Sequence, residues 1–173
     1  MVWVKDAQGN NVHAQTRAYK IEYVNEEGKG EFALQENGSI LSGYALSGTE
    51  TTLLATLDPH YENMRLSYCA IDDLGAATEY MSCQPGDSFT VTSDLRFKME
   101  ADRKSYDVVF HLGDRGTASI DAQRVVYLHY ATEPDPQYDN GYLVTGWYRD
   151  ENLTDRFDFK TMPVESDLSL YAK

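Results

Sequence analysis

The sequence is short of several residue types, and each shortage argues against a class of protein. Its 173 residues include two cysteines and five prolines. No apolar run approaches the ~20 residues needed to cross a membrane, so no membrane insertion of this segment is expected. Lys and Arg total 15 against 28 Asp and Glu, which gives a net charge of −13. Nucleic-acid backbones and anionic membrane surfaces require clustered basic residues, so neither is an expected partner.

Side chains with catalytic or metal-binding chemistry are sparse and scattered. Of the four histidines, only His111 and His129 fall on strands expected to be neighbours. No CxxC, HExxH, GxSxG or phosphate-binding glycine loop is present. The acidic loop EPDPQYDNG, at 133–141, lacks the spacing of known calcium loops. We therefore predict no enzyme activity, no cofactor and no metal site.

What the sequence does contain is a repeated β pattern. Apolar residues make up 42% of the chain, enough to pack a core, and 13 residues are tyrosine, which suits half-buried sheet surfaces. Short helical turns are expected only near 117–123 and 152–156. Alternation of period two predicts a mostly β fold with strands at 19–24, 51–57, 64–71, 77–83, 87–92, 94–101, 106–112, 122–130, 141–148 and 167–173.

The two halves of the chain follow the same order. One opens with YKIEYVNEEGKG and the other with YDVVFHLGDRG, and each closes with Ser-Asp-Leu followed by an alternating strand. This predicts two diverged copies of one module, at 19–102 and 103–173. The leading segment 1–18 is either the tail of a preceding domain or an added edge strand. The short Ser and Asp side chains are expected to hold a local turn before the last strand.

The stretch GYLVTGWYRDENLTDRFDFKTMPVESDLSLYAK resembles the end of the Listeria–Bacteroides repeat, the B-repeat of internalin-type surface proteins. The likeness extends back to about Tyr106, and the first half is similar to a divergent version in which no Trp follows Tyr61. The resemblance implies two small β-grasp-like modules with mainly antiparallel sheets. The matching elements are Gly141-Tyr142, Gly146-Trp147-Tyr148, Asp150, Leu153-Thr154, Phe157-Asp158-Phe159, Pro163-Val164 and Leu168-x-Leu170-Tyr171-Ala172-Lys173.

The resemblance also implies a role and a location. It indicates a non-catalytic repeat region of a bacterial cell-surface or secreted protein, acting as a spacer or in adhesion. The start Met1-Val2-Trp3-Val4-Lys5 is unlike a signal peptide, so the signal and the anchor are expected outside this segment. The alternatives are a module that binds a host protein or a glycan, or an accessory domain of an extracellular enzyme.

Three groups of residues carry more specific predictions. The first is Tyr127, Tyr130 and Tyr138, which flank the 133–141 loop and either form an exposed stacking patch or pack on the sheet. The second is Cys69 and Cys83. They face each other if their hairpin is centred near Ala76, which permits a disulfide; otherwise they are half-buried free thiols. The third is a predicted core, reached through a bulge or kink at Gly146, of Trp147, Phe157, Phe159, Leu168 and Leu170.

Overall fold

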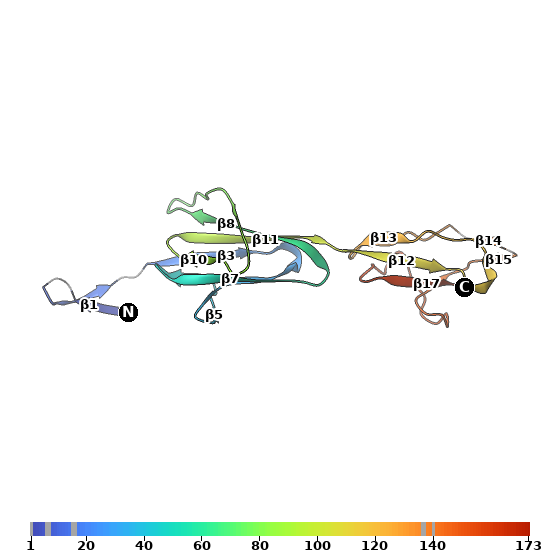
Figure 1. Ribbon diagram of the computed structural model, residues 1–173, viewed down its shortest axis with the longest axis horizontal. Helices are drawn as coiled ribbons and strands as arrows, with labels where there is room; N and C mark the ends of the chain where they lie inside the picture. The colour runs from blue at the N-terminus through green and yellow to red at the C-terminus, as the bar shows by residue number, and fades with distance from the viewer. Residues whose placement is uncertain (1, 6–7, 15–16, 136–137, 140) are drawn as a thin grey trace. The chain divides into compact units, whose positions relative to one another are not determined.

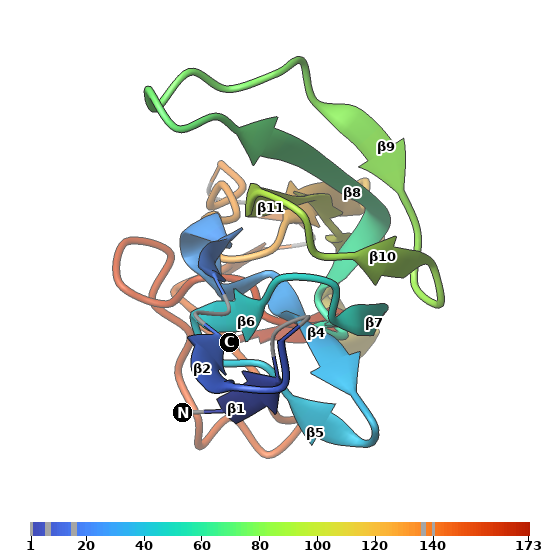
Figure 2. The same ribbon diagram turned by 90° about the vertical axis from the view of Figure 1, so that its left-hand side faces the viewer.

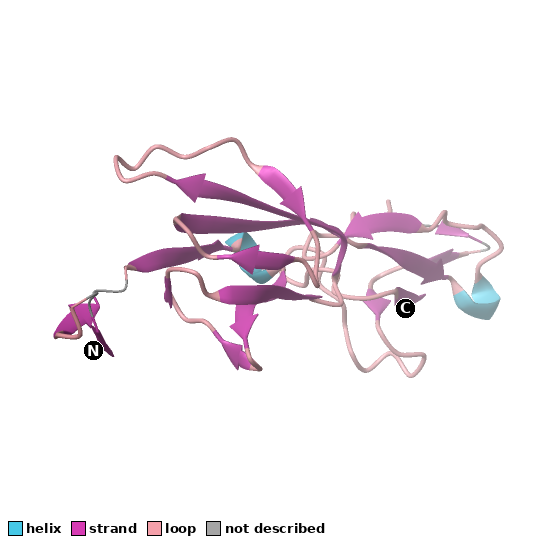
Figure 3. Cartoon of the chain, turned by 60° about the vertical axis from the view of Figure 1, so that its left-hand side comes forward, coloured by secondary structure: helices cyan, strands magenta, loops and turns pink. Residues whose placement is uncertain are grey.

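A computed structural model describes residues 2–5, 8–14, 17–135, 138–139 and 141–173 (Figure 1). Strands dominate its regular structure, which confirms the mostly β fold class (Figure 3). Contacts divide the chain into two compact units, Met1–Asp102 and Arg103–Lys173, which are described separately below. Most strand pairs are antiparallel, and the β-grasp-like topology implied by the resemblance stays a prediction.

The first unit contains two sheets that share one core. A five-stranded sheet has the order β6-β3-β11-β8-β9, in which β3 and β11 run parallel, and Figure 2 shows β9 beside β8. A four-stranded antiparallel sheet has the order β10-β7-β4-β5, and β1 pairs only with β2. The bounds are β1 Val2–Lys5, β2 Asn11–Ala14, β3 Ala18–Val24, β4 Gly30–Glu36, β5 Ser39–Ile40, β6 Tyr44–Leu46, β7 Glu50–Leu57, β8 Tyr61–Ile71, β9 Met81–Cys83, β10 Ser88–Thr90 and β11 Asp94–Arg103.

Strand β11 shows why the first unit folds as two layers. Leu95, Phe97 and Met99 alternate with more exposed residues, so all three side chains face the same side of the sheet. They pack with Leu34 and Leu53, which come from the other sheet and are fully buried. The apolar faces of both sheets therefore remove one another from water, which is the main source of stability for this unit.

The second unit is one four-stranded sheet covered by long loops. Its order is β13-β12-β17-β16, with β12 and β17 parallel and both outer strands antiparallel to their neighbours. A short separate pair is formed by β14 and β15. The bounds are β12 Ser105–His111, β13 Gln123–Val126, β14 Tyr138–Asp139, β15 Tyr142–Leu143, β16 Trp147–Tyr148 and β17 Leu168–Ala172.

The helical turns lie elsewhere than the sequence predicts. The helical segments in the described residues are the 3-10 turns η1, Glu26–Gly28, and η2, Gly113–Arg115, so the turns predicted at 117–123 and 152–156 are wrong. At 150–155 the carboxylate of Asp150 accepts hydrogen bonds from the backbone N–H groups of Thr154 (3.0 Å) and Asp155 (2.7 Å). The Asp150 side chain therefore closes this loop, instead of the backbone hydrogen bonds of a helix. None of the helical segments described has the length and apolar character that crossing a bilayer requires.

The same kind of hydrogen bond joins β3 to β11 in the first unit and β12 to β17 in the second. Asp94 Oδ1 accepts from the backbone N–H of Lys20 (2.8 Å), and Asp167 Oδ1 accepts from that of Asp107 (2.9 Å). The acceptor and donor are 74 and 60 residues apart, so the Asp of each Ser-Asp-Leu motif joins distant strands. The local turn predicted for this motif is therefore an incomplete account, because the decisive partner lies in the opening strand.

The turn after β6 matches the turn after β13. Gly48 N–H donates to the carbonyl of Val91 (2.8 Å), and Leu128 N–H donates to the carbonyl of Val164 (2.9 Å). Both residues have left-handed backbone angles, with φ of 84° at Gly48 and 63° at Leu128. Val91 and Val164 are both almost fully buried. The two units thus share backbone geometry at a position where the residue types differ.

Candidate functional site

The predicted core of the second unit comes together in one cluster. Trp147 is 2% exposed, and its ring lies 5.0 Å from that of Phe110, edge to face. Phe157 and Phe159 are also buried, with ring centroids 4.9 Å apart, Leu170 is fully buried, and Leu168 packs against the cluster.

A break in the strand turns Trp147 inward. Strand β15 ends at Leu143 and β16 begins at Trp147. Between them, the carbonyl of Gly146 accepts a hydrogen bond from the N–H of Lys173 (2.9 Å). Val144 packs on the core, whereas Tyr142 stays 49% exposed and becomes available to a surface site.

The three tyrosines predicted to flank a binding loop have different surroundings. The ring of Tyr127 lies 6.3 Å from that of Tyr106 in an edge-to-face contact, so it packs on the sheet. Tyr130 is 55% exposed. The side chain of Tyr138 lies outside the described residues. The binding role of these three tyrosines stays a prediction.

The register that would align the two cysteines is wrong, and both thiols are free. Cys83 lies opposite Leu66, three positions from Cys69 along β8. An odd offset places two residues on opposite faces of a strand, so the pair cannot form a bridge in this register. Burial, with the nearby carboxylate of Asp87, raises the pKa of the Cys83 thiol to about 11.

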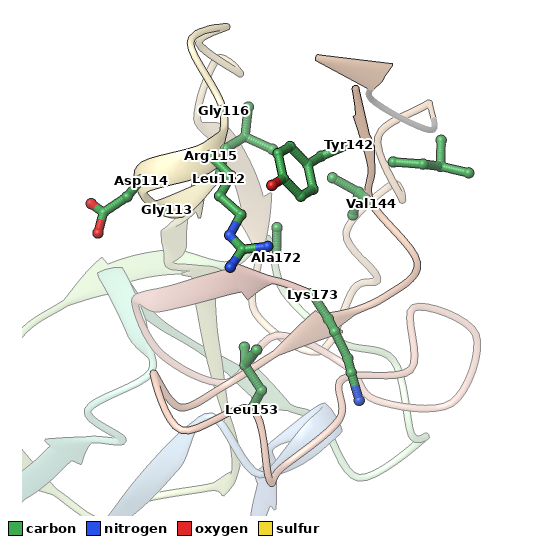
Figure 4. A pocket seen from close by; sticks show the side chains of 11 residues that line it. Leu112, Gly113, Asp114, Arg115, Gly116, Tyr142, Val144, Leu153, Ala172 and Lys173 are labelled. Carbon is green, nitrogen blue, oxygen red and sulfur yellow. The ribbon is translucent and has the colours of Figure 1, made fainter. Parts of the chain in front are cut away.

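One concave surface of the second unit is a groove between η2 and β15 (Figure 4). It has a volume of about 450 Å³. The side chain of Arg115 extends into it, with the guanidinium carbon 4.8 Å from the centroid of the Tyr142 ring. Asp114 and Lys173 also line the groove, and Figure 4 shows the Asp114 carboxylate directed away from the Arg115 guanidinium. We call this feature the Arg115–Tyr142 groove; its apolar lining includes Leu112, Val144, Leu153 and Ala172.

The turn that carries Arg115 depends on two glycines. Gly113 has a φ of 71°, which residues with a Cβ rarely adopt. At Gly116, a Cβ would stand 2.5 Å from the Cβ of Leu112, so a larger residue would displace one wall of the groove. Nothing in the linear sequence distinguishes Arg115 except its place between these glycines, and its partner Tyr142 is 27 positions further along the chain. Sequence reasoning therefore missed this groove.

Metal-binding clusters are not found in the part of the chain that the structure describes, where no three His, Cys, Asp or Glu side chains converge. His111 instead stacks on Tyr171 across β12 and β17, with ring centroids 4.9 Å apart and planes 18° from parallel. The geometry at this position is therefore that of an aromatic pair on a sheet surface.

The second unit is a compact module with a four-stranded sheet, a kink before Trp147 and an aromatic core. Its sequence can be compared with those of known domains. Residues 106–173 match the family model of the Listeria-Bacteroides repeat domain. Over these residues the chain is similar to the Listeria-Bacteroides repeat. The resemblance drawn from the sequence is confirmed over these residues, which correspond to the second unit from the second residue of β12 onward.

Two relatives come from the bacterium Evansella cellulosilytica. A protein named as a Gly-rich membrane protein is 34% identical over 91 residues, which cover 52% of this chain and 10% of that protein. A second, named as a membrane protein, is 33% identical over 84 residues, covering 49% of this chain and 12% of that protein. The chain thus spans about a tenth of the length of these relatives.

Proposed function

We propose that this chain is a non-catalytic spacer segment of a bacterial cell-surface or secreted protein, built from two diverged copies of the Listeria-Bacteroides repeat. The observation that carries the proposal is a hydrogen bond and a parallel strand pair that occur at matching positions in the two units. In each, an aspartate at the N-terminal end of β11 or β17 accepts a hydrogen bond from the backbone of the third residue of β3 or β12, and the two strands then pair in parallel. Units that repeat in series suit a stalk, since its length grows with the number of copies.

The register supports the assignment of the first unit as a diverged copy. Leu95 pairs with Ile21 in the first unit, and Leu168 pairs with Val108 in the second, each one residue beyond the bonding aspartate and its donor. The antiparallel neighbours of β3 and β12 also correspond. Tyr19 of β3 pairs with Ala45 of β6, and Tyr106 of β12 pairs with Val125 of β13. The first unit therefore keeps the backbone frame of the repeat although its sequence has changed.

Composition and relatives support a location outside the cytoplasm. The net charge of −13 favours solubility over binding to polyanions. Both bacterial relatives carry names that describe membrane proteins, and most of their length lies outside the matched region. A spacer joined to other domains of a surface protein fits these lengths.

Replacement of the segment in its parent protein would test the spacer role. Residues 17–173 would be exchanged for two unrelated β modules of similar length, with a single short module as the control. Antibody labelling of an epitope beyond the segment should persist with the long replacement and fall with the short one, because only reach matters to a spacer. Loss of cell-surface function with both replacements, while labelling persists, would contradict the proposal and favour a ligand-binding role.

A further inference from the structure

The Arg115–Tyr142 groove holds a cation that forms no ion pair with the carboxylates whose side chains the structure describes. Ion pairs with carboxylates engage many basic side chains of the chain, among them Arg65, Arg96 and Arg124. The guanidinium of Arg115 instead lies over the ring of Tyr142. The groove therefore presents a cationic group on a protein whose net charge is −13.

The first unit has no basic residue at the position that corresponds to Arg115. Arg115 ends η2, and Gly28 occupies the corresponding last position of η1. The parallel pairing of β12 and β17 ends at His111 and Tyr171, and Lys173 lies two residues beyond Tyr171. The corresponding residue of the first unit is Glu100, two beyond Lys98, which pairs with Val24. Neither basic residue therefore belongs to the pattern that the two units share.

The shape and lining of the groove limit the size of its ligand. Its volume of about 450 Å³ lies toward the small end of the range for ligand sites. Leu153 and Val144 supply apolar surface, and Tyr142 supplies a half-exposed ring with a polar tip. The backbone of Gly113 and Gly116 lines the same side as Arg115 with no side chain to cover it. A ligand with one apolar face and several hydroxyl groups matches this distribution.

The charges of the protein favour a ligand with a single negative charge. A guanidinium binds a carboxylate through two parallel hydrogen bonds, which favours one carboxylate at Arg115. A polyanion such as a heavily sulfated chain would meet repulsion from the other acidic residues of the protein. We propose that the Arg115–Tyr142 groove binds a single acidic sugar residue of the uronic acid type, with its carboxylate on Arg115 and its apolar face against Leu153 and Tyr142. This goes beyond the spacer role, which would hold with the groove empty.

NMR titration of the intact chain with methyl glucuronide would test the site. Amide shifts should be confined to residues 112–116, 142–144, 153 and 172–173, with a dissociation constant on the order of 1 mM for so small a ligand. Methyl glucoside has the same ring without the carboxylate and should bind at least tenfold more weakly. Equal binding of glucoside, equal binding of acetate, shifts only outside these residues, or no shifts would each overturn the proposal.

Two substitutions at Arg115 separate binding from folding. Arg115→Gln should weaken glucuronide binding at least tenfold, and Arg115→Lys should weaken it several-fold, because lysine keeps the charge but not the paired donors. Arg124→Gln is the matched control, since Arg124 lies in the same unit and is already paired with Asp107. Unchanged affinity in Arg115→Gln or Arg115→Lys would overturn the site. Tighter binding of an acetylated peptide with one glutamate would overturn the assignment to a sugar.

Discussion

The carboxylate of Asp167 accepts a hydrogen bond from the backbone N–H of Asp107 at 2.9 Å, which joins the start of the last strand to the start of the first. The strands β12 and β17 run parallel from this point, and parallel neighbours cannot be linked by a tight turn. The aspartate therefore fixes the register between segments far apart in the sequence.

Removal of this acceptor should destabilise the second unit. Asp167→Ala is expected to lower its free energy of unfolding by about 1 kcal/mol, the usual value of one such bond. Asp167→Asn should recover most of the loss, because the amide oxygen also accepts. Urea unfolding followed by the fluorescence of Trp147 in a Trp3→Phe background would measure both. Glu165→Ala is the control at an exposed carboxylate, and equal losses in Asp167→Ala and Asp167→Asn would contradict the role assigned to the acceptor.

Trp147 should be the most costly single truncation in the second unit. Trp147→Ala removes a ring that is 2% exposed and leaves a cavity beside Phe110, so we expect a loss of roughly 3–5 kcal/mol. Thermal unfolding monitored by circular dichroism would report it. Tyr130→Ala, at a side chain that is 55% exposed, should change stability by less than about 0.5 kcal/mol. A melting temperature unchanged by Trp147→Ala would remove this residue from the core.

The corresponding turns at Gly48 and Leu128 predict that exchanging Leu for Gly stabilises the protein and that exchanging Gly for Ala destabilises it. Leu128 has a φ of 63°, and Leu128→Gly should relieve that strain and raise stability by about 0.5 kcal/mol after the extra freedom of the unfolded glycine is counted. Gly48→Ala should lower stability by about 1 kcal/mol, although no atom lies within 4 Å of the new Cβ. Chemical unfolding of each variant and of the natural chain would measure the two changes in the free energy of unfolding. Stabilisation by Gly48→Ala would show that backbone strain is not the governing factor.

Cys83 should make stability depend on pH in the alkaline range. Its pKa is raised by burial to about 11 from an ordinary value of 9.0, so the folded state holds the proton that the unfolded state releases. The stabilisation is complete below about pH 9 and is lost as pH rises toward about 11. Unfolding curves across this range should fall less steeply for Cys83→Ala than for the natural chain. Parallel curves would show that the thiol does not titrate as assigned.

Thiol counting tests the strand register independently. Because Cys83 lies opposite Leu66 and not Cys69, the unfolded protein prepared without reductant should react with two equivalents of a thiol reagent. In the folded protein the fully buried Cys69 should react much more slowly than after unfolding. Intact mass before and after reduction gives the control. A difference of two hydrogen atoms would reveal a bridge and a different register for β8 and β9.

The sequence by itself determined the features that depend on local pattern. Alternation of period two identified the mostly β class, and a bulge or kink expected at Gly146 predicted a core that includes Trp147, Phe157 and Leu170. The run from Gly141 onward was enough to recognise the Listeria-Bacteroides repeat, which the family model matches from residue 106.

Only the tertiary structure decided which distant groups meet. The register of Cys83, the partner of Asp167 and the approach of Arg115 to Tyr142 depend on how strands pair across long loops. A shift of one residue reverses the faces of a strand, and an alternating pattern is unchanged by a shift of two. Periodicity therefore identifies strands and their buried faces, whereas packing against the rest of the unit sets their partners and creates the groove.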